Sequence, residues 1–135
     1  VSMNYVQRRH SVTCLQSHLV FTTKYRRKIF LDEHIEQLRW AFGLACEKLD
    51  IDLQEFDGEL DHVHLLIQYP PKLSISVIVN SLKATSSRRF KTLNRGYGRL
   101  GKNGALWSRS YFAANVGDAP IAVLKKYIQN QRASE

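Results

Sequence analysis

Cysteine, proline and long apolar runs are all scarce in this 135-residue chain. Its two cysteines, Cys14 and Cys46, cannot build a disulfide scaffold, nor a thiolate zinc site by themselves. No apolar run approaches the ~20 residues that a membrane-spanning helix needs. The start of the sequence does not join a basic segment to a long apolar one, as a secretory signal does. We therefore expect a reduced, cytoplasmic protein with no membrane partner.

Acidic residues are outnumbered by basic ones, 12 against 20, which gives a formal net charge of +8 with the histidines neutral. Such an excess favours a polyanionic partner, nucleic acid first. The hydrophobic fraction of 44% and the charged fraction of 24% are ordinary for a folded chain, so disorder is not expected. The length fits one domain, and we expect residues 1–135 to form it.

Four segments have the composition of β-strands. β-Branched and aromatic residues predict a strand over 18–23, and an alternating pattern predicts another over 51–56. A third strand is expected over 62–69, after a turn at Gly58, and an aromatic-rich fourth over 107–116. The short separation of the two middle strands predicts an antiparallel hairpin.

Helical spacing of apolar residues fills the gaps between these strands. One helix is expected from an N-cap at Asp32 to about Lys48, a second is capped by Ser74, and a last one begins at Asp118. The glycines and cations of 94–104 predict a mobile loop. The order β-α-β-β-α-β-α predicts an α+β fold, an antiparallel sheet with helices packed on it.

The most specific pattern is a pair of histidines, His62 and His64, separated by one residue. Side chains two apart on a strand share a face, so both imidazoles are expected opposite the apolar Val63 and Leu65. Neutral imidazoles bind divalent metal ions, but two ligands do not complete a site. An ordinary pair of surface or hydrogen-bonded histidines is an equal alternative on this pattern alone. Strand parity predicts that Asp61 points away from both, outside the ligand set.

Two residues of the final helix lie on the margin of its apolar stripe. Tyr127 and Gln131 are four residues apart, so they lie one helical turn from each other on the same face. Taken alone, Tyr127 is most simply interpreted as a tyrosine whose ring is packed and whose hydroxyl is exposed to solvent. Gln131, taken alone, is most simply interpreted as a solvated side chain near a chain end.

Basic residues gather after the first strand and at the end of the second helix, with Tyr25 and Phe90 among them. A run of like charge is most often a solvated face. Combined with the overall excess of positive charge, the interleaved aromatics favour phosphate contacts and base stacking. Six residues are therefore candidate DNA contacts: Lys24, Arg26, Arg27, Lys83, Arg88 and Arg89.

Five segments together match a known pattern. They are the opening strand with its basic turn (18–27), the Asp-His-Val-His-Leu-Leu strand (61–66), the Leu-Lys-Ala-Thr-Ser-Ser-Arg-Arg helix (82–89), the last strand (106–112) and the C-terminal helix (116–131). In this order the chain resembles the single-tyrosine HUH transposases of the insertion-sequence 200/605 family, which mobilise small bacterial insertion sequences as single-stranded DNA. The resemblance implies a ferredoxin-like sandwich.

The same resemblance implies roles for the candidate residues. His62, His64 and Gln131 would ligate Mg²⁺ or Mn²⁺, and Tyr127 would attack single-stranded DNA near a hairpin to form a covalent 5′-phosphotyrosine. A cation at the scissile phosphate offsets its charge and stabilises the leaving 3′ oxygen. The family also implies a homodimer with composite sites, in which the tyrosine helix docks on the partner's histidine pair.

Two other functions remain open from the sequence. One is a domesticated relative with the same chemistry that acts at genomic repeats instead of mobilising its own element. The other is a non-catalytic nucleic-acid-binding domain on the same fold, with histidines that are only structural.

Overall fold

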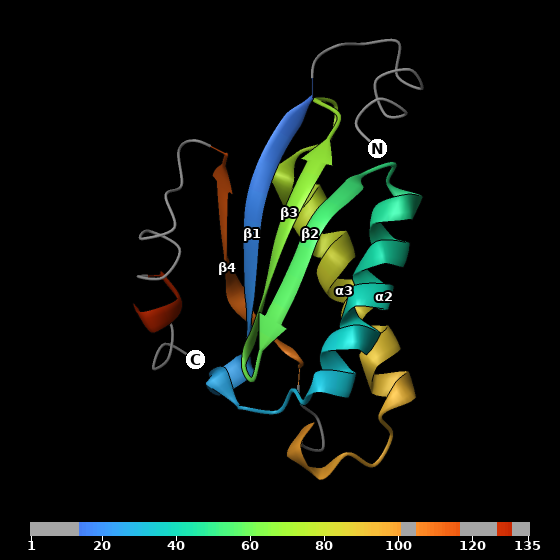
Figure 1. The fold of residues 1–135 in the computed structure, drawn as a ribbon, viewed down its shortest axis with the longest axis vertical. Coiled ribbons are helices and arrows are strands. Elements are labelled where there is room, and N and C mark those ends of the chain that lie inside the picture. Colours follow the sequence, from blue (N-terminus) through green and yellow to red (C-terminus); the bar gives the residue numbers. More distant parts are fainter. Residues whose placement is uncertain (1–13, 101–104, 117–126, 131–135) are drawn as a thin grey trace.

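The computed structural model describes residues 14–100, 105–116 and 127–130. Four strands form one antiparallel sheet in the order β2-β3-β1-β4 (Figure 1). In chain order the strands are β1 (Leu15–Thr23), β2 (Asp52–Glu59), β3 (His62–Tyr69) and β4 (Trp107–Asn115). The helices are α2 (Asp32–Lys48) and α3 (Ile75–Leu93), and the short 3₁₀ turns are η1 (Lys24–Arg26) and η2 (Gly98–Leu100).

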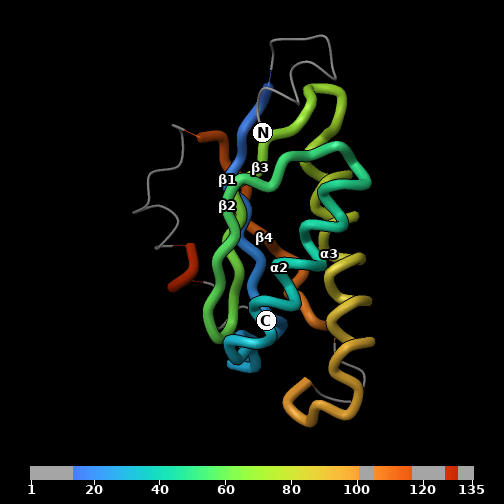
Figure 2. The backbone as a smooth tube through the Cα atoms, turned by 45° about the vertical axis from the view of Figure 1, so that its right-hand side comes forward, coloured from blue at the N-terminus to red at the C-terminus, as the bar shows by residue number. Residues whose placement is uncertain are grey.

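Both long helices pack on the same face of the sheet, and a short helical turn at 127–130 lies on the other side (Figure 2). The predicted α+β fold with an antiparallel sheet is confirmed. The expected final helix is described only over 127–130, because its start at Asp118 lies outside the described residues.

Strand alternation determines which side chains enter the core. The burial of β3 alternates along its whole length, with the odd-numbered Val63, Leu65 and Ile67 fully buried under the helices. On β1, Phe21 faces the same way and stacks on Phe42 of α2, with ring centroids 5.7 Å apart. The even-numbered positions of both strands are therefore left for the opposite face.

The ends of the helices follow the expected chemistry with one shift. Ser74 caps α3 as predicted, since its hydroxyl oxygen accepts from the backbone N–H of Val77 at 3.2 Å. Asp32 is the first residue of α2 and not its N-cap, which is Leu31. The Leu31 N–H donates to Nδ1 of His34, 3.0 Å away, so a buried imidazole in the first turn of α2 accepts from the N-cap residue.

Gly58 does not mark a turn, which corrects the sequence prediction. It lies inside β2, and a β-carbon there would come within 2.8 Å of Cδ1 of Ile35 on α2. The glycine therefore lets a helix side chain approach the strand, and the turn falls at Leu60 and Asp61.

The segment expected to be a mobile loop is held to the domain in its described part. The Tyr97 hydroxyl donates to the carbonyl of Ile29 at 2.7 Å, and the Asn94 amide donates to the Gln37 side chain at 2.6 Å. Residues 94–100 are thus a tied-down connection that contains η2, while 101–104 lie outside the described ranges.

Among the described helices, none is long and apolar enough to cross a membrane.

The buried cysteine gives a simple check of the packing. Burial, and to a smaller extent the negative charge of Asp52, raises the pKa of the Cys46 thiol to about 12. The thiolate is the reactive species, so we expect Cys46 to resist alkylation by iodoacetamide at about pH 8. The half-buried Cys14 should be alkylated under the same conditions. Mass spectrometry of the labelled protein measures this. Equal labelling of both cysteines in the folded protein would contradict the packing of α2.

Candidate active site

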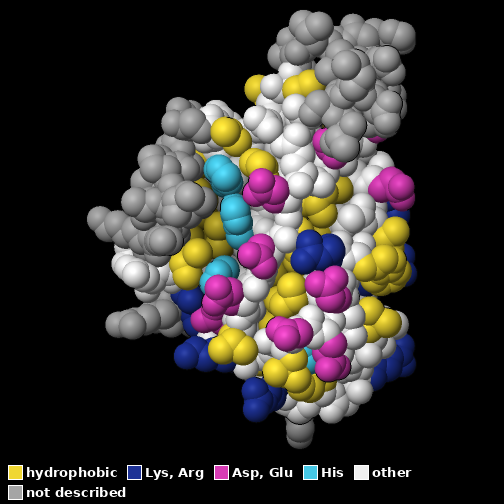
Figure 3. Space-filling view, viewed as in Figure 1, with side chains coloured by type: hydrophobic (Ala, Val, Ile, Leu, Met, Phe, Trp, Pro, Cys, Tyr) yellow, Lys and Arg dark blue, Asp and Glu magenta, His cyan; other side chains and the backbone are white. Residues whose placement is uncertain are grey.

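The face of the sheet opposite the helices carries a line of histidine side chains, with acidic side chains beside it (Figure 3). His62 and His64 both lie on this face of β3 and are half-buried. Strand pairing places Thr22 of β1 directly opposite His62, and Val20 opposite His64. Val20 is 0% exposed although it lies outside the core cluster, so the centre of this histidine face is covered too.

Asp61 orients the first of the two imidazoles. Its Oδ1 accepts from Nδ1 of His62 at 3.0 Å, which leaves Nε2 of that ring for another partner. The prediction that Asp61 points away was wrong, because the residue lies in the turn before β3, where strand parity does not apply. Burial raises the pKa of Asp61, but the bonds with His62 and Arg26 outweigh it and hold the pKa below its ordinary value.

His18 joins the histidine pair from the neighbouring strand. Its Nδ1 lies 3.1 Å from Nε2 of His64, and the two rings stack with centroids 5.3 Å apart. Burial, and then the nearby His18, lowers the pKa of His64 more than the acidic Glu55 and Asp57 raise it. From the sequence, His18 was predicted only to begin a strand. The available signal was its even-numbered position, which it shares with Val20 on the histidine face.

The described turn brings Tyr127 to the same face within one chain. The Tyr127 ring lies against Phe112 of β4, with centroids 5.2 Å apart and an interplanar angle of 48°. Phe112 of β4 pairs with Val20 of β1, and Val20 pairs with His64 of β3. These three residues form one row across the sheet, so the Tyr127 ring contacts the β4 end of the row that contains His64. Gln131, the expected third ligand, lies outside the described residues.

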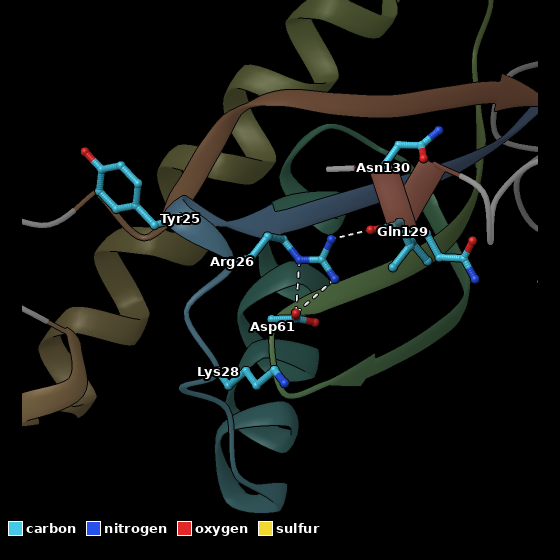
Figure 4. A pocket seen from close by; sticks show the side chains of 7 residues that line it. Tyr25, Arg26, Lys28, Asp61, Gln129 and Asn130 are labelled. Atoms are coloured by element: carbon cyan, nitrogen blue, oxygen red, sulfur yellow. Dashed lines mark hydrogen bonds and ion pairs between the residues drawn. The ribbon is translucent and has the colours of Figure 1, made fainter. Parts of the chain in front are cut away.

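A second link between the turn and the sheet comes from η1. Arg26 reaches Asp61 through Nε at 3.0 Å and Nη2 at 2.9 Å, and its Nη1 donates to the backbone carbonyl of Ile128. These groups line an open cleft of about 860 Å³ between η1 and residues 127–130 (Figure 4). In the close-up, Arg26 points into the cleft, while the Tyr25 ring points away from it.

The backbone of η1 is strained where it presents this arginine. Tyr25 has φ 62° and Arg26 has φ 51°, both in the left-handed region. A residue with a β-carbon pays roughly 1–2 kcal/mol to adopt that conformation. Contacts of the two side chains with the rest of the molecule have to offset this cost.

The six candidate DNA contacts have different surroundings. Arg26 and Arg27 direct their guanidinium groups to protein oxygens, and the Lys83 ammonium donates to the carbonyl of Ser108 at 2.6 Å. Lys24 lies over the ring of Tyr25, with 5.4 Å between its Nζ and the centroid, and Arg89 lies over that of Trp40, with 5.6 Å between its Cζ and the centroid. Arg88 is exposed. Their contacts with DNA stay predictions.

The histidine face has donors that suit a divalent cation. A carboxylate that holds one ring nitrogen of a histidine, as Asp61 holds that of His62, is the usual second layer around a metal-binding imidazole. The Thr22 hydroxyl, opposite His62, is buried with no hydrogen-bond partner within the described part of the chain. Over that same part, no three His, Cys, Asp or Glu side chains gather closely enough to hold an ion alone.

Comparisons with known proteins identify the family of the chain. The family model described as "Transposase IS200 like" matches residues 11–131. The transposase for insertion sequence element IS200 of Salmonella typhimurium is 32% identical over 118 residues, which cover 84% of this chain and 74% of that protein. The ISDra2 transposase TnpA of Deinococcus radiodurans is 29% identical over 124 residues, covering 90% of this chain and 86% of that one.

Solved structures give the same answer for the fold. A crystal structure from Deinococcus radiodurans, described as that of a transposase, has 30% identity and a TM-score of 0.81, covering 90% of this chain and 94% of that chain. A REP-associated tyrosine transposase bound to a REP hairpin has a TM-score of 0.56, covering 86% of this chain and 61% of that chain. At 14% identity, the second likeness shows the fold alone.

These matches define the class of the protein as a transposase, a DNA-cleaving enzyme. Within that class, the chain belongs to the IS200-like family, the IS200/IS605 transposases.

Proposed function

We propose that the protein cleaves and rejoins single-stranded DNA through a covalent bond to Tyr127, during excision and insertion of a mobile element. The observation that supports this most directly is the position of the Tyr127 ring on the same face of the sheet as His62 and His64, within one chain. A phenol that served only to fill a core would be expected under the helices, with Leu65 and Phe42.

The proposed reaction is a transfer of one phosphodiester bond. The Tyr127 phenol gives up its proton and its oxygen attacks the scissile phosphorus. The bond to the 3′ oxygen breaks, and that oxygen takes up one proton and leaves as a 3′-hydroxyl, so that no net proton is gained or lost. The product is a 5′-phosphotyrosine, which conserves the energy of the phosphodiester bond. Attack by a second 3′-hydroxyl reverses the step and joins the strand to a new partner.

His62 and His64, with Gln131 as the third protein ligand, are the proposed holders of Mg²⁺ or Mn²⁺. A cation there supplies charge neutralisation at the phosphate oxygens and stabilises the leaving oxygen. Asp61 keeps the Nδ1 of His62 engaged, so this ring would bind through Nε2. Nitrogen donors match Mn²⁺ better than Mg²⁺.

The DNA partner is proposed to be a single strand with a hairpin near the cleavage site. The net charge of +8 supports binding to phosphates, and the hairpin is what the REP-associated relative is described as binding. We also propose that two copies assemble, and that the tyrosine helix can serve either its own histidine face or the partner's. A cytoplasmic location follows from a DNA substrate.

Detection of the covalent intermediate tests the function. The protein is incubated with Mn²⁺ and a 3′-labelled, hairpin-bearing single strand, and the expected product is a labelled band that migrates with the protein on a denaturing gel. Trypsin cleaves after Lys126 and Arg132, so mass spectrometry should find the nucleotide on the peptide 127–132.

Several results would overturn the proposal. A nick without an adduct indicates attack by water, and an adduct on a peptide other than 127–132 removes Tyr127 as the nucleophile. Binding of the hairpin with neither product, under conditions in which a related transposase cleaves its own hairpin-bearing substrate, favours the non-catalytic alternative.

A further inference from the structure

A single guanidinium connects the two halves of the candidate active site. Arg26 bonds Asp61 through two nitrogens, and through the third it donates to the carbonyl of Ile128, the residue after Tyr127 (Figure 4). Asp61 uses its other oxygen for Nδ1 of His62, at 3.0 Å. A continuous series of hydrogen bonds therefore runs from a proposed metal-binding imidazole to the turn that carries the phenol.

The environment of Arg26 differs from that of a DNA-binding cation on a surface. Its side chain is 11% exposed and that of Asp61 is 13% exposed. The strained backbone of η1, with positive φ at Tyr25 and Arg26, directs the guanidinium inward. Strain of this kind at residues with a β-carbon is found where surrounding contacts impose it, and it concentrates at functional sites.

We propose that Arg26 is a positioning residue that holds the tyrosine turn against the histidine face. This inference rests on the proposed function and adds to it the residue that brings phenol and imidazole together. Arg26 acts through the Ile128 carbonyl and through Asp61, and it contacts neither the scissile phosphate nor the cation. This role takes the place of the DNA contact that its charge alone suggests.

Arg27 provides a matched control next along the chain. Its guanidinium donates to three backbone carbonyls, those of Lys24, Leu100 and Ala105. It thus stabilises the same turn and carries the same charge, but none of its described bonds reaches Asp61 or Ile128. Replacing Arg27 therefore measures the effect of losing one positive charge and the bonds that stabilise η1, without losing the bonds to Asp61 and Ile128.

The first readout needs neither DNA nor metal. The chain is labelled with 3-fluorotyrosine, and the ¹⁹F resonance of Tyr127, one of six tyrosines, is identified by its absence in Tyr127→Phe. In Arg26→Gln this resonance is expected to move toward the position of an unfolded tyrosine, because the turn is no longer held against Phe112. In Arg27→Gln it is expected to stay in place even if the melting temperature falls.

Arg26→Lys separates positioning from charge and preserves the ion pair with Asp61, so it tests the idea even if Arg26→Gln fails to fold. One ammonium lacks the planar fork that bonds a carboxylate and a carbonyl at once. We therefore expect the Tyr127 resonance to move in Arg26→Lys too. If Arg26 served mainly as a positive charge for DNA, lysine would restore wild-type behaviour.

Kinetics give the second readout. With saturating hairpin DNA and Mn²⁺, both Arg26 variants are expected to form the adduct about 10–100-fold more slowly, the range found when a residue that orients a metal ligand is removed. Hairpin affinity should change by less than about threefold, so that the loss falls on kcat and not on KM.

An unchanged Tyr127 resonance in both Arg26 variants would overturn this inference, and so would wild-type adduct formation by Arg26→Lys. A failure of the proposed function appears elsewhere, as an adduct that persists in Tyr127→Phe, and the ¹⁹F measurement does not depend on that result.

Discussion

Tyr127→Phe is expected to reduce adduct formation by at least about 10³-fold, because it removes the only atom that the proposed reaction joins to DNA and leaves the ring intact. The ring contact with Phe112 needs no hydroxyl, so the turn should remain docked and the fold unchanged. Hairpin affinity should stay within about threefold of wild type. Single-turnover cleavage of labelled DNA, together with fluorescence anisotropy for binding, measures both quantities.

Tyr25→Phe is the matched control for this substitution. Tyr25 is 61% exposed and lines the cleft between η1 and residues 128–130, and its ring points away from the cleft interior (Figure 4). Loss of its hydroxyl should leave the rate of adduct formation close to that of wild type. Undiminished adduct in Tyr127→Phe would exclude this tyrosine as the nucleophile, whatever the control does.

His62→Ala and His64→Ala are each expected to lower the cleavage rate by about 10³-fold. Each removes a proposed metal ligand, and with the ion is lost a stabilisation of the transition-state charge of several kcal/mol. Binding of Mn²⁺, followed by electron paramagnetic resonance, should weaken in parallel. Both residues are half-buried on the histidine face, outside the hydrophobic core, so the fold should persist. Hairpin binding without metal should persist as well.

Leu66→Ala is the control for this pair. Leu66 is half-buried on the same strand and face, and its removal creates a similar loss of contact without removing a nitrogen donor. It should lower thermal stability while cleavage and Mn²⁺ binding continue. An equal loss of hairpin binding in the histidine variants would instead mean that the imidazoles only support the fold, as in the non-catalytic alternative.

Local patterns were sufficient to predict most of the fold. The alternation of β3 from His62 to Tyr69 identified the strand, its bounds and the face of the histidine pair, because period-two burial depends only on neighbouring residues. Ser74 was recognised as a cap for the same reason, since a cap contacts the backbone two or three residues ahead. The end of α2 at Lys48 also agreed.

Contacts between distant segments were not predictable in this way. His18 was missed as a partner of His64 because the register of β1 against β3 is a tertiary property. Gly58 was assigned to a turn because nothing near it in the sequence reveals that Ile35 approaches it. The bonds of Arg26 with Asp61 were not foreseen, because charge alone does not show where a turn with positive φ directs a side chain.

The position of β1 and β3 inside the sheet has a consequence for strand exchange. Each of these strands is hydrogen-bonded on both sides, so the spacing of the imidazoles is fixed by two ladders. The Tyr127 ring lies against Phe112, and the turn that carries it is bonded to Arg26 through the Ile128 carbonyl. In the proposed reaction, any movement of a protein group between breaking and joining would leave the imidazoles in place. The tyrosine would move instead, with its attached DNA end, from one acceptor to the next.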